Sequence, residues 1–219
     1  MKNANKYLLL SIIFLSLFLA WTLLLIFIDV RSVGSMNTKI GLSSINLPIR
    51  DALGFNEILY VITDYLGLFP IIFVSFFAVF GLYQAVKRKS IMRVDKSILL
   101  LGAFYIIVFG MFALFEIFVV NYRPVLINST LEASYPSSTT LLVGTVIPTC
   151  AIQIKLRIKS RKIKNSLIAI LSVFAIFMIV ARLFSGVHWI SDIIGGILLS
   201  FGLVFLYCFA INKIPDKRA

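Results

Sequence analysis

The stretch RLFSGVHWISD, residues 182–192, separates two long apolar runs and contains the only histidine of the chain, His188. If a helix begins near Trp189, His188 and Asp192 are four residues apart and share one face of it. A carboxylate placed there can accept the proton of one imidazole nitrogen and leave the other nucleophilic, and Arg182 can hold an oxyanion through paired hydrogen bonds. The alternative is that His188 is an interfacial residue at a helix end and that Asp192 only caps that helix.

The composition around this stretch is that of a membrane protein. Of the 219 residues, 60% are hydrophobic and the mean hydropathy is +1.03, which is too apolar for a soluble domain. A net charge of +12 would suit nucleic acid in a soluble protein, but here the basic residues lie between apolar runs, and we expect no nucleic-acid partner. Each of the two cysteines lies inside an apolar run, so no disulfide or metal site is implied. We therefore expect one integral membrane domain over residues 1–219.

Six apolar runs are long enough to cross a bilayer of about 30 Å as helices, so the predicted fold class is an all-α, six-span transmembrane bundle. The first run is too long for the core of a signal peptide and is expected to stay as a helix. Asp64 and Pro70 make the start of the second run uncertain, and the outer loop before it, 31–56, is expected to hold a short interfacial helix. The predicted spans lie within 7–30, 58–86, 97–120, 136–154, 166–184 and 189–212.

The distribution of basic residues predicts the orientation of the bundle. Sixteen of the 21 Lys and Arg residues fall at the two ends of the chain and in the loops after the second and fourth spans. Cytoplasmic loops carry the excess of Lys and Arg, so both termini are expected in the cytoplasm. Arg123, the stretch 135–140, Arg182, His188 and Asp192 then meet at the outer ends of the spans.

The stretch 135–140, Tyr-Pro-Ser-Ser-Thr-Thr, opens the fourth span. Proline suits the first turn of a helix, and serine or threonine beside it suits the cap. The free amide groups and the positive end of the helix dipole favour an anion at such a place. A plain helix start is the simpler interpretation, but two arginines at the same depth require an anion nearby.

These motifs resemble the type 2 phosphatidic acid phosphatase family, which is related to the vanadium haloperoxidases. The third family signature, Ser-Arg followed by His and Asp at fixed spacing, is matched by Arg182, His188 and Asp192, with Ala181 in place of serine. The second, Pro-Ser-Gly-His, reads Pro-Ser-Ser-Thr at 136–139.

The first family signature is Lys, six residues and Arg-Pro. Here Arg123-Pro124 is kept and Glu116 stands at the lysine position. The resemblance covers roughly residues 116–196, and it extends to the six-span topology.

The resemblance implies a role for each matching residue. His188 would attack phosphorus and carry a phosphohistidine intermediate, and Asp192 would orient it. Positioning and charge stabilisation are what phosphoryl transfer mainly requires, and the resemblance implies neither a cofactor nor a metal. The groups expected to bind the phosphoryl oxygens are Arg123, Arg182, Ser137 and the backbone at Ser138.

Two departures from the signatures, Thr139 and Glu116, leave open which group protonates the leaving group. The family histidine that protonates the leaving group is replaced by Thr139, whose hydroxyl is a very weak acid near neutral pH. One interpretation is a lipid diphosphate substrate, whose leaving group needs no proton. Another is that Glu116 or Glu132 donates the proton. A third is an inactive relative that only binds lipid phosphates.

The expected function is hydrolysis of a lipid phosphate or lipid diphosphate, for example a polyprenyl diphosphate, at the outer face of the plasma membrane. The substrate and the surrounding membrane lipids are the expected partners, and no stable protein partner is predicted. A lipid phosphotransferase shares the covalent step and stays open as an alternative, as does the catalytically weak or inactive phosphate-binding relative.

Overall fold

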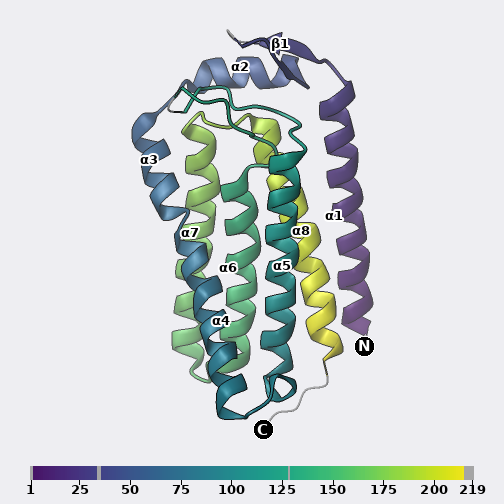
Figure 1. The fold of residues 1–219 in the computed structure, drawn as a ribbon, viewed down its shortest axis with the longest axis vertical. Coiled ribbons are helices and arrows are strands. Elements are labelled where there is room, and N and C mark those ends of the chain that lie inside the picture. Colours follow the sequence, from purple (N-terminus) through teal and green to yellow (C-terminus); the bar gives the residue numbers. More distant parts are fainter. Residues whose placement is uncertain (1, 34–35, 128, 215–219) are drawn as a thin grey trace.

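The computed structural model describes residues 2–33, 36–127 and 129–214. Its long helices run side by side and form an upright bundle (Figure 1). Six helical segments of the described chain are long and apolar enough to cross a membrane, which confirms the predicted all-α, six-span fold class of a multi-pass membrane protein. The end of the basic tail, 215–219, lies outside the described residues. The long helices are α1 (Lys2–Phe27), α4 (Phe69–Lys87), α5 (Lys96–Ile117), α6 (Ser138–Arg157), α7 (Arg161–Phe184) and α8 (Ile190–Lys213).

Helices α6 and α8 form the centre of the bundle. About half of the apolar window of each is buried, 56% and 50%, against at most 28% for the other spans. Gly144 faces the Ser200 side chain and Gly196 faces Thr140, with no room for a Cβ at full van der Waals distance. Because small residues let two helix backbones approach closely, these positions draw α6 and α8 together and fix the depth of the residues at the ends predicted to face outside, which are called the outer ends.

The predicted second span is two helices rather than one. Helix α3 (Glu57–Leu66) ends at Gly67, and α4 begins at Phe69. Pro70 has no backbone N–H, so it fits the first turn of a new helix, where that group would have no partner. The uncertain start of this span therefore marks a real break, and α3 leans toward α7 at the outer end of the bundle (Figure 1).

The outer end is covered by the segment between α1 and α3. A two-stranded antiparallel hairpin, β1 (Arg31–Val33) and β2 (Thr38–Ile40), leads into α2 (Ser43–Leu53), which lies across the top of the bundle (Figure 1). The Asn46 amide donates to Ser191 Oγ at 2.9 Å and accepts from Ser191 N at 3.2 Å. The predicted loop therefore does contain a short helix, which is tied to the first turn of α8.

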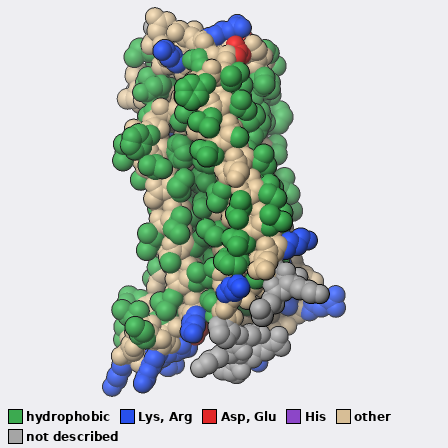
Figure 2. Space-filling view, turned by 90° about the vertical axis from the view of Figure 1, so that its right-hand side faces the viewer, with side chains coloured by type: hydrophobic (Ala, Val, Ile, Leu, Met, Phe, Trp, Pro, Cys, Tyr) green, Lys and Arg blue, Asp and Glu red, His purple; other side chains and the backbone are tan. Residues whose placement is uncertain are grey.

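The surface follows the predicted membrane pattern. Figure 2 shows hydrophobic side chains along the length of one face and Lys and Arg side chains gathered toward its lower end. The predicted cytoplasmic loops lie at that end, with the short helix η1 (Ile91–Arg93) between α4 and α5. Several helices extend beyond the predicted spans: α1 starts at Lys2 rather than 7, and α7 starts at Arg161 rather than 166, because Ser160 caps α7 and Lys and Arg are good helix formers.

Candidate active site

His188 lies in the short turn between α7 and α8. Helix α7 ends at Phe184, and Gly186 takes a positive φ of 70° that reverses the chain. Glycine is required there twice over, since a Cβ would also collide with the backbone of Gly54. The turn holds His188 at 4% exposure, immediately before the N-cap of α8, Trp189.

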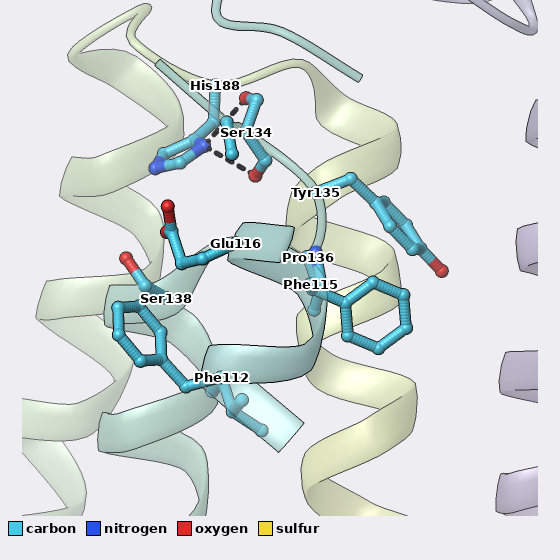
Figure 3. Close-up of a pocket in the computed structure, with 10 residues that line it drawn as sticks. Phe112, Phe115, Glu116, Ser134, Tyr135, Pro136, Ser138 and His188 are labelled. Carbon is cyan, nitrogen blue, oxygen red and sulfur yellow. Dashed lines mark hydrogen bonds between the residues drawn. The ribbon is translucent and has the colours of Figure 1, made fainter. Parts of the chain in front are cut away.

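The imidazole of His188 is oriented by Ser134. Its Nδ1 lies 3.1 Å from the Ser134 carbonyl oxygen and 3.0 Å from Ser134 Oγ (Figure 3). A carbonyl can only accept, so Nδ1 carries the hydrogen and Nε2 keeps a free lone pair. A neutral imidazole in this tautomer presents a nucleophilic nitrogen to the space below it.

Asp192 supports this arrangement from behind. Its Oδ2 lies 3.9 Å from His188 Nδ1, beyond hydrogen-bonding distance, and Ser134 Oγ donates to the same Oδ2 at 2.5 Å. Asn121 Nδ2 donates to Oδ1 at 3.1 Å, and Trp189 N donates to Oδ2 at 3.0 Å. Asp192 therefore caps α8, as one of the two interpretations predicted, and it is linked to His188 through Ser134 rather than by the direct hydrogen bond that the other predicted.

Burial and charge keep His188 neutral. Burial lowers the pKa of His188 to about 4, and the nearby positive charges of Arg182 and Arg123 act in the same direction, against the opposing effect of Asp192. Because a buried imidazolium beside two guanidinium groups is unfavourable, the neutral form persists well below neutral pH. The lone pair of Nε2 is then available without a base to deprotonate the ring.

Arg182 is buried at 1% exposure and is held by helix α3. Its Nη1 donates to Thr63 Oγ1 at 3.1 Å, and its guanidinium carbon lies 5.4 Å from the centre of the Tyr60 ring. Asp64 Oδ1 lies 3.8 Å from Nη2. Asp64, which made the start of the second span uncertain, therefore lies beside Arg182.

Arg123 enters the site from the loop between α5 and α6. Its Nη2 forms an ion pair with Glu132 Oε2 at 3.1 Å, and its backbone N donates to the Glu132 carbonyl at 3.1 Å. The Arg123 side chain is 11% exposed and that of Glu132 is 39% exposed. The two arginines thus differ: Arg182 is fixed by a buried hydroxyl, and Arg123 by a partly solvated carboxylate.

Three nitrogens of this cluster are buried and, among the described residues, have no hydrogen-bond partner. They are His188 Nε2, Arg182 Nε and Arg123 Nε. Buried polar groups are almost always paired, so a group of unpaired ones at one place calls for an explanation. Arg182 and Arg123 lie near enough for their charges to act on His188, and two free N–H donors beside a free lone pair are groups that can bind an oxyanion.

The comparisons with known proteins agree with this geometry. The family model described as PAP2 superfamily matches residues 116–215, which include every signature residue of the site. This match over 100 of the 219 residues supports assigning the chain to the PAP2 superfamily. Its fold is similar to the crystal structure described as the first transmembrane PAP2 type phosphatidylglycerolphosphate phosphatase from Bacillus subtilis. The TM-score is 0.68 at 18% identity, with 95% of this chain and 99% of that chain covered. A search of curated proteins finds no match.

The residues of the second signature, 136–139, have different places in the structure. Ser137 is the N-cap of α6, and its Oγ accepts from Thr140 N at 3.4 Å and from Thr140 Oγ1 at 3.1 Å, at 0% exposure. Its hydroxyl is therefore engaged in the helix start that sequence reasoning predicted. Ser138, the first residue of α6, lines a pocket beside His188, and Thr139 is not among the residues that line it.

Glu116 lines this pocket together with His188. Glu116 and Ser138 point into the space next to the His188 ring (Figure 3). The cavity volume is about 10 Å³, roughly the room for one water molecule. Its far side is apolar and is lined by Phe112, Phe115 and Leu141. Within the described residues, no group of three His, Cys, Asp or Glu side chains is placed to hold a metal ion.

Sequence reasoning missed Ser134, Asn121 and Thr63. Ser134 and Asn121 face each other across the loop, since Ser134 N donates to the Asn121 carbonyl at 2.9 Å. Both adjoin predicted motifs, so proximity along the sequence could have drawn attention to them. Thr63 offered no such signal, because it lies 119 residues from Arg182.

Proposed function

We propose that the protein hydrolyses a lipid phosphate or lipid diphosphate at the outer face of the plasma membrane through a phosphohistidine at His188. The observation that carries the proposal is the set of three buried nitrogens, on His188, Arg182 and Arg123, that lack partners among the described residues. The match to the PAP2 superfamily and the shared fold support a lipid phosphatase.

The first chemical step forms one bond and breaks another. His188 Nε2 donates its lone pair to phosphorus, and the bond from phosphorus to the leaving oxygen breaks. The two guanidinium groups and the amide at Ser138 stabilise the negative charge on the equatorial oxygens. Nδ1 keeps its hydrogen and its hydrogen bond to Ser134. Ser134 and Asp192 together stabilise the positive charge that develops on the ring.

A monophosphate ester also requires a proton for its leaving oxygen. Of the three candidate donors, Glu132 is engaged with Arg123 and Thr139 does not line the pocket, whereas Glu116 faces the space beside His188. We infer that Glu116 gives this proton and then takes one back from the water that hydrolyses the phosphohistidine. When the substrate is a lipid diphosphate, the leaving group is a lipid phosphate and needs no such proton.

The shape of the pocket supports a lipid substrate. Polar groups, His188, Ser134 and Glu116, form one side, and aromatic rings, Phe112 and Phe115, form the other. The cavity has room for about one water molecule, so a head group has to widen it to reach the polar side, with its chain near the apolar side.

A phosphate-release screen tests the proposal. Purified protein is offered a polyprenyl diphosphate, phosphatidic acid and phosphatidylglycerol phosphate, the last because the similar structure is named for it. We expect release from at least one of them, no release by His188→Ala, and unchanged release in EDTA. Orthovanadate binding without turnover of any substrate would instead favour a binding protein, and transfer to an added lipid alcohol would favour a phosphotransferase.

Glu116→Gln separates the two substrate classes. An amide cannot donate the proton, so hydrolysis of monophosphate esters should fall by about 10²-fold or more while hydrolysis of diphosphates is kept. Glu57→Gln is the control, because Glu57 opens α3 and does not line the pocket. Equal losses on both substrate classes would refute the role of Glu116.

The orientation is tested by labelling single cysteines in intact cells. Ile45→Cys lies in α2, with 49% of the side chain exposed, and Met92→Cys lies in η1, with 92% exposed. An impermeant thiol reagent should label only the first of these. The reverse pattern would place the site in the cytoplasm.

A further inference from the structure

Helix α3 contacts the site although it lies outside the part of the chain that the family signatures cover. The PAP2 match begins at residue 116, whereas α3 spans Glu57–Leu66. Its contacts are with α7, which carries Arg182. The break before α4 leaves α3 as a separate short helix at the same depth as the site (Figure 1).

The hydroxyl of Thr63 acts as a hydrogen-bond acceptor toward the guanidinium of Arg182. Thr63 is 0% exposed, and Oγ1 lies 2.7 Å from the Leu59 carbonyl and 3.0 Å from the Tyr60 carbonyl. Because a hydroxyl has one hydrogen and these carbonyls accept it, the oxygen presents a lone pair to Arg182 Nη1 at 3.1 Å. The hydroxyl can accept from the arginine in only this orientation.

The rest of α3 holds this hydroxyl in place. Asn56 caps the helix, with Leu59 N donating to Asn56 Oδ1 at 3.0 Å, and Asn56 N donates to the Ser185 carbonyl at 3.0 Å. The start of α3 is therefore bonded to the turn that carries His188. The Tyr60 ring lies against the guanidinium and limits its rotation.

We propose that Thr63 is a positioning residue for Arg182, with Tyr60 as its support. The proposal rests on the proposed function, since it assigns the purpose of the fixed arginine to phosphoryl transfer. Held at Nη1 from the side of α3, the guanidinium keeps Nε free for the phosphoryl group. A long side chain that is already oriented needs no reordering when charge develops on the equatorial oxygens.

The primary test is Thr63→Val, with Thr145→Val as the matched control. Both threonines are 0% exposed and bond back to the carbonyl four residues earlier, at 2.7 Å in each case, but Thr145 is bonded only to α6. With phosphatidic acid or a polyprenyl diphosphate as substrate, we expect Thr63→Val to lower kcat about tenfold with little change in KM. Thr63→Ser should restore kcat to within about threefold, and Thr145→Val should stay within about twofold of the wild type.

A double-mutant cycle excludes a general effect on folding. In the Arg182→Lys background the hydroxyl has no guanidinium to position, so Thr63→Val should cause less than a twofold further loss. The same tenfold loss in both backgrounds would overturn the proposal, as would equal kcat values for Thr63→Val and Thr145→Val.

Orthovanadate supplies a readout that does not depend on turnover. Its stabilising effect on Tm in detergent should be smaller for Thr63→Val than for Thr145→Val. A wild type that turns over lipid phosphates, with equal vanadate shifts and equal kcat for the two variants, would overturn the role of Thr63 alone. A wild type with neither turnover nor a vanadate shift would overturn this role together with the proposed function.

Discussion

The two ends of the bundle each contain a buried polar cluster, and the two clusters differ in one respect. The outer cluster consists of Arg123, Ser134, Arg182, His188 and Asp192. It contains buried nitrogens that have no partner among the described residues, on both arginines and on the histidine. The inner cluster, at the basic end, is also polar and partly buried, with the side chains of Arg157 and Asp95 at 27% and 40% exposure. It consists of Gln84, Asp95, Gln153, Arg157 and Tyr207.

The inner cluster is internally satisfied. Gln84 and Asp95 exchange two hydrogen bonds of 2.9 Å, and Gln153 Nε2 donates to Tyr207 OH at 2.5 Å. Arg157 donates to Gln153 Oε1 and, at 3.0 Å, to Ser97 Oγ. Within the described residues, none of its buried side-chain nitrogens or oxygens lacks a partner. These bonds join α4, α5, α6 and α8.

The difference separates stability from function. A satisfied buried network holds helices together, and removing one partner leaves the others unpaired at a cost of about 1–3 kcal/mol. The outer cluster has hydrogen bonds of its own, but it also contains three nitrogens without partners among the described residues, and such a cost persists where function requires it. We therefore propose that the inner cluster mainly stabilises the bundle and that the outer cluster binds the substrate.

The largest expected effect comes from the nucleophile. His188→Ala should lower turnover by about 10³-fold or more, because no other group can form the covalent intermediate. Its Tm should stay within a few degrees of the wild type, since the imidazole is buried with one nitrogen unpaired. A large fall in Tm would break the comparison, because the outer cluster would then stabilise the fold as the inner one does.

A pair of matched substitutions exchanges the two arginines for lysine. Arg182→Lys should lower turnover by about 10²-fold, since one ammonium cannot reproduce the forked contact, with a small change in Tm. Arg157→Lys should keep turnover per folded molecule within about twofold and lower Tm. Activity and Tm measured on both variants test this, and a loss of turnover by Arg157→Lys would contradict it.

Ser134→Ala sharpens the account of the outer cluster. The carbonyl still accepts from His188 Nδ1, but the link to Asp192 is lost, so kcat should fall by about tenfold with KM unchanged. Ser200→Ala is the control, because Ser200 is buried on α8 and bonds only to carbonyls of α6. A larger loss for Ser200→Ala would remove the special role of Ser134.

The smallest expected effect is a difference in pH dependence. Unfolded His188 binds a proton near pH 6.5, whereas the folded protein resists this until about pH 4. Stability is thus full above pH 6.5 and falls as the pH drops from there toward 4. His188→Asn should therefore reduce the fall in Tm between pH 7.5 and 4.5.

Asp95 provides the contrast at the inner end. Burial alone would raise the pKa of Asp95, but hydrogen bonds from Gln84 and Arg88 and the charges of Arg88 and Arg157 hold it below the ordinary value. Its contribution is lost only below the range where free aspartate titrates, about pH 3.9. Asp95→Asn should therefore leave the change in Tm between pH 7.5 and 4.5 as it is, and an equal effect of the two variants would remove the contrast.

Much of this protein could be predicted from local sequence. Length and hydropathy predict six spans because each crosses the bilayer independently of the others. The spacing of Arg182, His188 and Asp192 indicated the signature because all three residues lie within the short stretch 182–192. The break at Pro70 appeared only as an uncertainty, since whether a proline kinks a helix or divides it depends on what packs against it.

The sequence by itself determined the membrane-spanning segments and the residue types that meet at one end of them. An apolar segment in a bilayer has to form a helix, because its backbone groups then bond to one another and need no water. The tertiary structure alone decided that Ser134 stands between His188 and Asp192, that Glu116 faces the imidazole, and that Thr63 holds Arg182. These contacts join positions far apart in the chain. They depend on how each helix is rotated and tilted against its neighbours, which side-chain packing sets and local sequence does not encode.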